Sequence, residues 1–376
     1  MSFIDSAASC NYNKFIHCLN TAHNTSVFER RYFCMNVRKI PANTPLIQYF
    51  GRWEKSLDAC RCAQGATYIK ANFTGRLLLA DLTDPGNWWR VSIDGSPFRR
   101  FRPQGENTLL AENLSAGRHK VLLVRSTEGY MGISEFRGFF LERSETLLPP
   151  DPPKPRCLEF IGDSITAGAK NDGPPDAPYD DIEDNDMAYG PQLARMLGAE
   201  YSVLGKSGEG VIHNWDEGWP GQGVHTADRY PWTFYSDKKS PTNHLWHPQN
   251  FPVDGILISL GTNDFGNDDH QPARQYFIQG YKNLLQTVRQ LNPQTPIIAV
   301  EPVPAWLPSE ARSWTKAAVM ECKALGDNNL FFIPLNEEKP LLEAQDYAGD
   351  NTHPLKNGSK KIALYLKDKV AEILGW

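Results

Sequence analysis

The chain has 376 residues, 40% of them hydrophobic, which is enough to bury two cores, so we expect two domains. The net charge is −5 and both signs are interspersed, which excludes the basic footprint needed to bind nucleic acid or anionic lipid. No apolar run reaches membrane-spanning length, so we expect a soluble chain with no membrane contact.

Residues 1–40 contain asparagine, cysteine and aromatic residues without a helical or strand period, and we expect them to form an N-terminal extension. They hold no apolar run long enough for the core of a signal peptide. The chain has seven cysteines, an odd number, so at least one lacks an intrachain partner. These features do not decide in which cellular compartment the protein works.

Residues 41–146 are predicted to form an all-β sandwich, because short β-rich runs alternate with glycine, aspartate and asparagine. The segment 147–155 carries five prolines in nine residues, which is typical of a stiff linker. Residues 156–376 then form the second domain, with helices expected near 189–197 and 275–291. The predicted strands of the sandwich are 67–73, 76–82, 88–93, 119–125 and 136–141.

A serine follows a predicted buried strand at the start of the second domain. The run CLEFI at 157–161 is apolar, and GDSITAG at 162–168 predicts a tight turn in which a helix begins. Ser164 would then lie at the carboxyl edge of a sheet, with its own N–H directed at an oxyanion formed on the group that it attacks. Ser164 is therefore a candidate nucleophile, although such a tripeptide also occurs in plain turns and helix caps.

Two further segments offer hydrogen-bond donors for an oxyanion. The glycine-rich loop SGEG at 207–210 follows a short apolar stretch, and either Gly208 or Gly210 can direct an N–H inward; we favour Gly208. A buried-strand pattern then ends in the turn GTND, which places the Asn263 amide at the same sheet edge. An ordinary turn and a helix cap are the alternatives for these two segments.

The segment DNTHP at 350–354 supplies a candidate base. Asp350 precedes His353 by three residues, so its carboxylate can accept a hydrogen bond from Nδ1 of the imidazole and leave Nε2 facing the serine. Alternatively, His353 is a surface residue before a proline and Asp350 caps the loop. Four such coincidences in chain order are much less probable than one shared site.

These four blocks resemble the SGNH, or GDSL, hydrolase superfamily over about residues 156–376. The Gly-x-Ser-x-Gly elbow of the other large serine-esterase fold does not occur in the chain. The resemblance implies a three-layer α/β/α domain with a parallel sheet. The residues that match those for which the superfamily is named are Ser164, Gly208, Asn263 and His353.

The order of the domains, together with several short motifs, is similar to carbohydrate esterase family 2. The motifs are FGRW at 50–53, VSIDG at 91–95, GRHKV at 117–121 and YGPQLAR at 189–195. This resemblance implies a jelly-roll sandwich packed against the catalytic domain, and removal of O-acetyl groups from plant cell-wall polysaccharides such as xylan and glucomannan. In this family an aspartate does not always orient the histidine, so Asp350 is the least secure of the expected catalytic residues.

Aromatic residues are dense between the glycine-rich loop and the GTND turn, where they either stack on sugar rings or pack against the other domain. We select Trp215 and Trp232 from this region as candidate substrate-binding residues. Trp306, in a proline-rich turn directly after a predicted strand, is the candidate sugar platform. Nearby histidines at 213, 225, 244 and 247 lack a third ligand at a known spacing, so we expect no metal site.

The reaction that follows is two-step acyl transfer without a metal or organic cofactor. The expected partner is an acetylated polysaccharide or oligosaccharide, and we expect a monomer. Two alternatives remain: a lipase or thioesterase on the same scaffold, and a carbohydrate-binding protein with a vestigial hydrolase domain. Members of the family are usually exported, which favours an extracellular location, but without a visible signal peptide a cytoplasmic one stays open.

Overall fold

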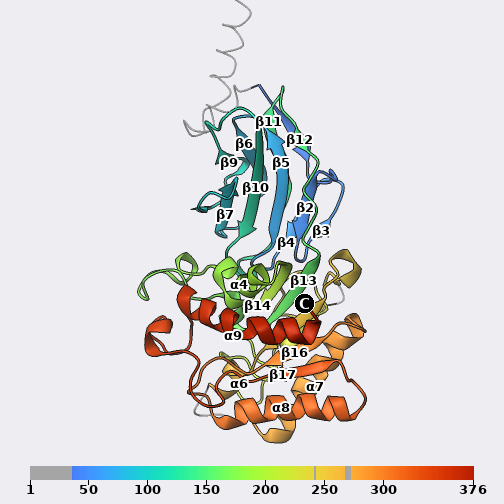
Figure 1. Ribbon diagram of the computed structural model, residues 1–376, viewed down its shortest axis with the longest axis vertical. Coiled ribbons are helices and arrows are strands. Elements are labelled where there is room, and N and C mark those ends of the chain that lie inside the picture. Colours follow the sequence, from blue (N-terminus) through green and yellow to red (C-terminus); the bar gives the residue numbers. More distant parts are fainter. Residues whose placement is uncertain (1–35, 241–242, 267–271) are drawn as a thin grey trace, which may run out of the picture.

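A β-sandwich is stacked on the end of an α/β domain in the computed structural model of the protein, which describes residues 36–240, 243–266 and 272–376 (Figure 1). The expected extension therefore falls largely outside the described residues. The sandwich begins earlier than the expected boundary at residue 41, because Val37–Pro41 (β1) pairs with a long strand, Ser134–Glu142 (β11).

Two antiparallel sheets form the sandwich within the described residues. Their strand orders are β3-β4-β11-β6-β9, with β1 beside β11, and β12-β5-β10-β7-β8, with β2 beside β5. All five strands expected from the sequence are present, so the sandwich prediction is confirmed. The other strands are β2 (Ile47–Phe50), β3 (Glu54–Lys55), β4 (Cys60–Cys62), β5 (Tyr68–Thr74), β6 (Leu78–Thr83), β7 (Trp89–Ile93), β8 (Arg99–Phe101), β9 (Gly105–Ala111), β10 (Arg118–Arg125) and β12 (Leu147–Leu148).

The inner faces of the two sheets make the sandwich core. Along β6, Leu78, Ala80 and Leu82 pack into this core, whereas Leu79 faces the other way and packs on Phe140. This alternation is the period of two that places successive side chains on opposite faces of a strand. The first residues of the expected linker are also part of the second sheet, since β12 pairs with β5.

The second domain has a wholly parallel sheet in the order β14-β13-β15-β16-β17, with helices on both faces. The three-layer prediction is confirmed, as are the two long helical segments expected from the sequence. The strands are β13 (Arg156–Gly162), β14 (Ala199–Gly205), β15 (Gly255–Ser259), β16 (Ile297–Val300) and β17 (Leu330–Ile333). The α-helices are α3 (Ser164–Ala167), α4 (Tyr189–Met196), α5 (Thr226–Arg229), α6 (Thr262–Phe265), α7 (Arg274–Leu291), α8 (Ser309–Ala324) and α9 (Lys356–Leu374), and the 3-10 turns are η1 (Gly129–Met131), η2 (Tyr179–Asp181), η3 (Asn185–Met187), η4 (Pro248–Asn250) and η5 (Ala344–Asp346).

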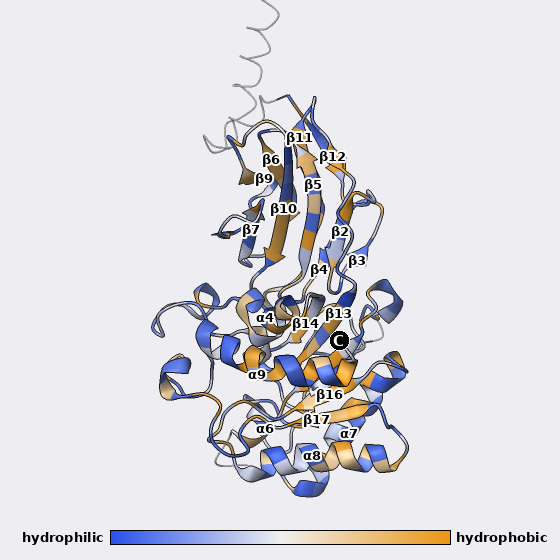
Figure 2. Cartoon of the chain, viewed as in Figure 1, coloured by the Kyte–Doolittle hydropathy of each residue, from blue (hydrophilic) through white to orange (hydrophobic). Residues whose placement is uncertain are grey.

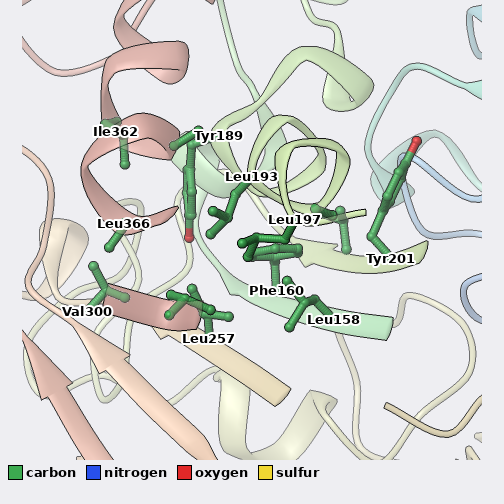
Figure 3. Close-up of a cluster of buried hydrophobic side chains, with 14 of the residues drawn as sticks. Leu158, Phe160, Tyr189, Leu193, Leu197, Tyr201, Leu257, Val300, Ile362 and Leu366 are labelled. Atoms are coloured by element: carbon green, nitrogen blue, oxygen red, sulfur yellow. The ribbon is translucent and has the colours of Figure 1, made fainter. Parts of the chain in front are cut away.

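Each face of the parallel sheet has its own apolar core. On one face, α4 and α9 place side chains such as Leu193 and Leu366 over Phe160 and Leu257 of the strands (Figure 3). On the other face, α7 and α8 pack against the same strands. The strands are therefore mostly hydrophobic, whereas α8 and α9 alternate hydrophobic and hydrophilic residues (Figure 2).

The three strands β13, β14 and β15 end at the same level. In the register of the sheet, Gly162 lies opposite Gly205 on one side and Ser259 on the other. Only glycine fits at position 162, because a Cβ there would lie 2.1 Å from Thr166 Oγ1 and 2.6 Å from the Ser259 carbonyl oxygen. The loops after these strands consequently start side by side at one edge, where the strand order reverses.

A buried ion pair joins the two domains. Arg52, from the loop between β2 and β3, is 0% exposed and contacts Glu159 of β13 at 3.3 Å. The same guanidinium donates to the carbonyl of Trp232 at 2.9 Å, and Tyr230 Oη donates to Glu159 at 2.8 Å.

Within the described residues, no helix has both the length and the apolarity needed to cross a membrane.

We predict that Glu159→Ala lowers the free energy of unfolding by about 3–5 kcal/mol, because it leaves the Arg52 charge buried without its carboxylate. Urea denaturation measures this change. Glu321→Ala, which breaks an exposed pair with Lys282, is the control and should cost about 0.5 kcal/mol. Equal losses in the two variants would contradict the structural role of the buried pair.

Candidate active site

Ser164 is the first residue of α3, and one residue, Asp163, separates it from the end of β13. The preceding Asp163 caps this turn, since its carboxylate accepts the Ile165 N–H at 3.0 Å and its carbonyl accepts the Ala167 N–H at 2.9 Å. Ser164 is only 6% exposed. The cap fixes the backbone at the serine, so its side chain has a defined direction at the sheet edge.

The loop before α9 brings a histidine to this serine. His353 Nε2 lies 2.9 Å from Ser164 Oγ, and His353 Nδ1 lies 2.7 Å from Asp350 Oδ2. The other oxygen of Asp350 accepts the backbone N–H groups of Thr352 at 3.0 Å and His353 at 2.9 Å. Asp350 therefore organises the loop and contacts the imidazole at the same time.

The charge on Asp350 is strongly stabilised. Burial alone would raise the pKa of this carboxyl, but hydrogen bonds from the side chain and backbone of His353 outweigh it and hold the pKa below its ordinary value. Lys170 Nζ adds a contact at 3.0 Å. The resulting stabilisation is present above the unfolded pKa of about 3.9 and is lost as the pH falls through the lower folded value.

The loop after β14 contains the two glycines proposed as oxyanion donors. Gly208 has φ of 75°, a conformation that favours glycine, and no described residue accepts its N–H in a hydrogen bond. The N–H of Gly210 instead donates to Asn214 Oδ1 at 3.0 Å. This difference favours Gly208 as the donor.

Asn263 belongs to α6, directly after the turn that ends β15. Its Nδ2 donates to the Glu209 carbonyl at 2.7 Å, which ties the amide to the glycine-rich loop and leaves its second hydrogen available. The neighbouring Asp264 accepts the backbone N–H groups of Val211 at 2.9 Å and Ile212 at 2.8 Å. The segment after β15 thus holds the loop after β14 in place.

Two of the candidate tryptophans lie together at the surface. Trp215 is 57% exposed and Trp306 is 48% exposed, and a Cβ built on Gly266 would lie 3.2 Å from the first indole and 3.5 Å from the second. The backbone N–H of Trp215 donates to the Gly208 carbonyl at 2.8 Å. Trp306 Nε1 donates to the Asn351 carbonyl at 3.1 Å, two residues before the histidine.

Trp232 does not join this pair. It is only 8% exposed, and its carbonyl accepts a hydrogen bond from Arg52 at the interface between the domains. The prediction that Trp232 binds sugar therefore does not fit its burial. Its position agrees with the alternative, in which an aromatic residue of this region packs against the other domain.

Three charged contacts at the site were not anticipated from the sequence. Lys170 pairs with Asp350, and Arg229 donates to the buried Glu209 at 2.6 Å. Glu128 reaches the glycine-rich loop from the β-sandwich. No local motif marks these residues, because each lies far along the chain from its partner.

Nucleophile, imidazole and carboxylate thus form one chain of hydrogen bonds, with backbone and amide donors on neighbouring loops. This arrangement can perform acyl transfer through a serine. In the part of the chain that the structure describes, no three His, Cys, Asp or Glu side chains are grouped to hold a metal ion.

The fold and the site together define an SGNH-type α/β hydrolase domain behind an N-terminal β-sandwich. The chain belongs to the GDSL-like lipase/acylhydrolase family, whose model matches residues 160–361. A second model, the carbohydrate esterase 2 N-terminal domain, matches residues 49–152. Both resemblances inferred from the sequence are confirmed.

Two curated relatives are similar over most of the chain. The cellulase/esterase CelE of Acetivibrio thermocellus is 29% identical over 343 residues, which cover 89% of this chain but 40% of that protein. The acetylxylan esterase / glucomannan deacetylase of Cellvibrio japonicus is 26% identical over 335 residues, covering 86% of this chain and 85% of that protein. The chain thus spans less than half the length of the first relative.

A solved structure shares the two-domain architecture. It is a family two carbohydrate esterase from Clostridium thermocellum in complex with cellohexaose. The TM-score is 0.77 and the identity is 27%, with 88% of this chain and 99% of that chain covered.

We predict that Asp350→Asn lowers kcat on nitrophenyl acetate by about three to four orders of magnitude, because the amide no longer stabilises the imidazolium or fixes its tautomer. Steady-state kinetics and the melting temperature are measured together. Lys170→Met, which keeps the carboxylate, should cause a much smaller loss. A stable, fully active Asp350→Asn variant would leave only a Ser164–His353 dyad.

Proposed function

We propose that the chain is a serine esterase that removes O-acetyl groups from plant cell-wall polysaccharides such as xylan and glucomannan. The observation that carries the proposal is the chain of hydrogen bonds from Ser164 through His353 to Asp350, beside two exposed tryptophans. The printed name of the Cellvibrio relative, acetylxylan esterase / glucomannan deacetylase, supports this substrate class.

The reaction begins when His353 Nε2 takes the hydroxyl proton of Ser164 and Oγ attacks the acetyl carbonyl carbon. The N–H groups of Ser164 and Gly208 and the amide of Asn263 then hold the oxyanion. When the tetrahedral intermediate collapses, the bond between the acetyl carbon and the sugar oxygen breaks, and the imidazolium gives its proton to that oxygen. The sugar alcohol departs, and the acetyl group stays on Ser164 as an acetyl-enzyme.

Water completes the cycle. His353 takes a proton from the water as its oxygen attacks the acetyl carbonyl, and the same donors hold the second oxyanion. Collapse of this intermediate breaks the bond to Ser164 Oγ, which takes the proton back from the imidazolium. Acetic acid is released and the serine is restored without a cofactor.

Trp215 and Trp306 provide the proposed sugar contact. Both indoles are exposed. The backbone N–H of Trp215 and the indole Nε1 of Trp306 each donate to a loop that carries a proposed catalytic group. Large aromatic faces stack well on the apolar faces of sugar rings. The carbohydrate-bound relative from Clostridium thermocellum is consistent with an oligosaccharide at such a surface.

A lipase or thioesterase is the second candidate, favoured by the match of residues 160–361 to a family described as GDSL-like lipase/acylhydrolase. It would require an apolar trench for a long acyl chain instead of tryptophans for a sugar. Nitrophenyl esters of increasing chain length separate the two: the proposed deacetylase prefers acetate, and a lipase prefers long chains. The intact nucleophile, base and amide count against a protein that only binds carbohydrate.

An extracellular location remains a prediction that rests on the same proposal, since plant cell-wall polymers lie outside cells. A monomeric state, and the absence of a nucleic-acid or membrane partner, are likewise predictions. Size-exclusion chromatography with light scattering tests the first of these.

We predict that the protein releases acetate from acetylated xylan and acetylated glucomannan, and that Ser164→Ala lowers turnover by several orders of magnitude while preserving the fold. Enzymatic acetate assay and circular dichroism provide the two readouts. Turnover near that of the wild type in Ser164→Ala would overturn the assignment of the nucleophile.

We predict that Trp306→Ala raises KM for acetylated xylo-oligosaccharides several-fold, because the loss of the stacking surface costs about 1 kcal/mol of binding free energy. Nitrophenyl acetate, which has no sugar, should show an unchanged KM in the same variant. Trp306→Phe keeps an aromatic face and should restore much of the affinity. An equal effect on both substrates would assign Trp306 to the integrity of the loop that contains Asn351.

A further inference from the structure

A carboxylate from the β-sandwich is buried against the glycine-rich loop of the catalytic domain. Glu128 follows β10, is 1% exposed, and accepts the backbone N–H of Ser207 at 2.6 Å through Oε2. Its other oxygen accepts a hydrogen bond from Ser207 Oγ. One side chain thus fixes both the main chain and the side chain of the residue before Gly208.

The Ser207–Gly208 peptide is consequently held on both sides. Tyr179 Oη lies 2.5 Å from Ser207 Oγ, and the carbonyl of Gly208 accepts the Trp215 N–H at 2.8 Å. The N–H of this peptide is the proposed Gly208 oxyanion donor. The Ser207 N–H and the Gly208 carbonyl belong to the peptide units on either side, and because both of these units are held, rotation of the planar unit between them is restricted and its N–H has fewer directions in which to point.

Glu128 is itself held by the sandwich. Arg125, fully buried at the end of β10, donates to the Glu128 carbonyl at 3.3 Å and to the Gly132 carbonyl at 3.0 Å. The backbone N–H of Glu128 donates to Glu183 of the catalytic domain at 3.0 Å. The backbone of Glu128 is therefore held at both its carbonyl and its N–H, so the carboxylate extends from a fixed position and not from a mobile surface loop.

The geometry points to a positioning role for Glu128: the β-sandwich supplies it to aim the Gly208 N–H at the oxyanion formed on Ser164. This inference rests on the proposed function and deepens it, since it makes the sandwich a working part of the active site. Glu128 acts through Ser207 and does not itself touch the reacting atoms.

A neutral side chain of the same shape can make the hydrogen bonds of Glu128 to Ser207. Burial raises the pKa of this carboxyl, against hydrogen bonds from Ser207 that lower it, and Glu183 is a second buried acid beside it. In Glu128→Gln the amide oxygen accepts the Ser207 N–H and the amide nitrogen donates to Ser207 Oγ, which then donates to Tyr179. A glutamine therefore preserves the geometry without placing a charge near the oxyanion.

The test compares kcat and KM on nitrophenyl acetate for the full chain with Glu128→Ala, Glu128→Asp and Glu128→Gln. We expect kcat to fall by about a hundredfold in the alanine variant, the effect of losing one oxyanion donor, with KM little changed. The aspartate variant is one methylene too short to reach Ser207 and should also lose kcat. Glu128→Gln should recover most of the rate.

Glu200→Ala is the matched control for loosening of the domain interface. Glu200 is a buried acid at the start of β14 that accepts from Tyr68 Oη at 2.6 Å and Lys70 Nζ at 2.7 Å across the same interface. It lies at the end of β14 away from the loop, so its removal should lower the melting temperature and leave kcat near that of the wild type. Equal losses of kcat in Glu200→Ala and Glu128→Ala would overturn the positioning role.

The rate of Ser164 labelling by a fluorophosphonate is measured in parallel, because the phosphoryl oxygen of this probe occupies the same oxyanion site. It should fall in Glu128→Ala and recover in Glu128→Gln. If the alanine variant does not fold, the comparison of aspartate with glutamine decides, and wild-type kcat in Glu128→Asp overturns the inference. If the wild-type protein is labelled at Ser164 but releases no acetate from acetylated xylan, the proposed substrate is wrong, and the positioning role of Glu128 is still tested by the labelling rates.

Discussion

The common end of β13, β14 and β15 at one sheet edge is the constraint on which the site depends. Parallel strands in register deliver the serine, the glycine-rich loop and the asparagine from segments up to about a hundred residues apart. Close packing fixes that edge, since at Gly162 even a Cβ would collide with Thr166 and the Ser259 carbonyl. The loop that contains His353 precedes α9, and it places the imidazole against a serine whose position is already fixed.

The second constraint is the interface between the domains. Arg52 and Glu159 place a buried charge pair at the junction, and Glu128 extends the contact as far as the glycine-rich loop. Charges buried in this way are costly unless both partners are present, which favours one relative arrangement of the domains. The β-sandwich therefore both covers the end of the α/β domain and contributes to the geometry beside Ser164.

The sequence was sufficient to predict the layers, the order of the domains and the serine, histidine and asparagine blocks, because each rests on local periodicity or a short motif. The domain boundary was less accurate, since β1 and β12 join their sheets through pairings with distant strands. Trp232 is selected for its type and its place in an aromatic-rich segment, neither of which predicts burial, and the structure places it at the interface between the domains. Glu128 and Lys170 carry no local signal, because only the fold brings them to their partners. The catalytic roles themselves remain predictions.

A covalent acetyl-enzyme on Ser164 is the central claim of this account. Mixing the protein with acetylated xylo-oligosaccharide, quenching in acid within the first turnovers and mapping the digested peptides by mass spectrometry tests it directly. The account predicts one added acetyl group on the peptide that contains Ser164, absent in Ser164→Ala. An acetyl group on another residue, or acetate release by Ser164→Ala at the wild-type rate, would contradict it.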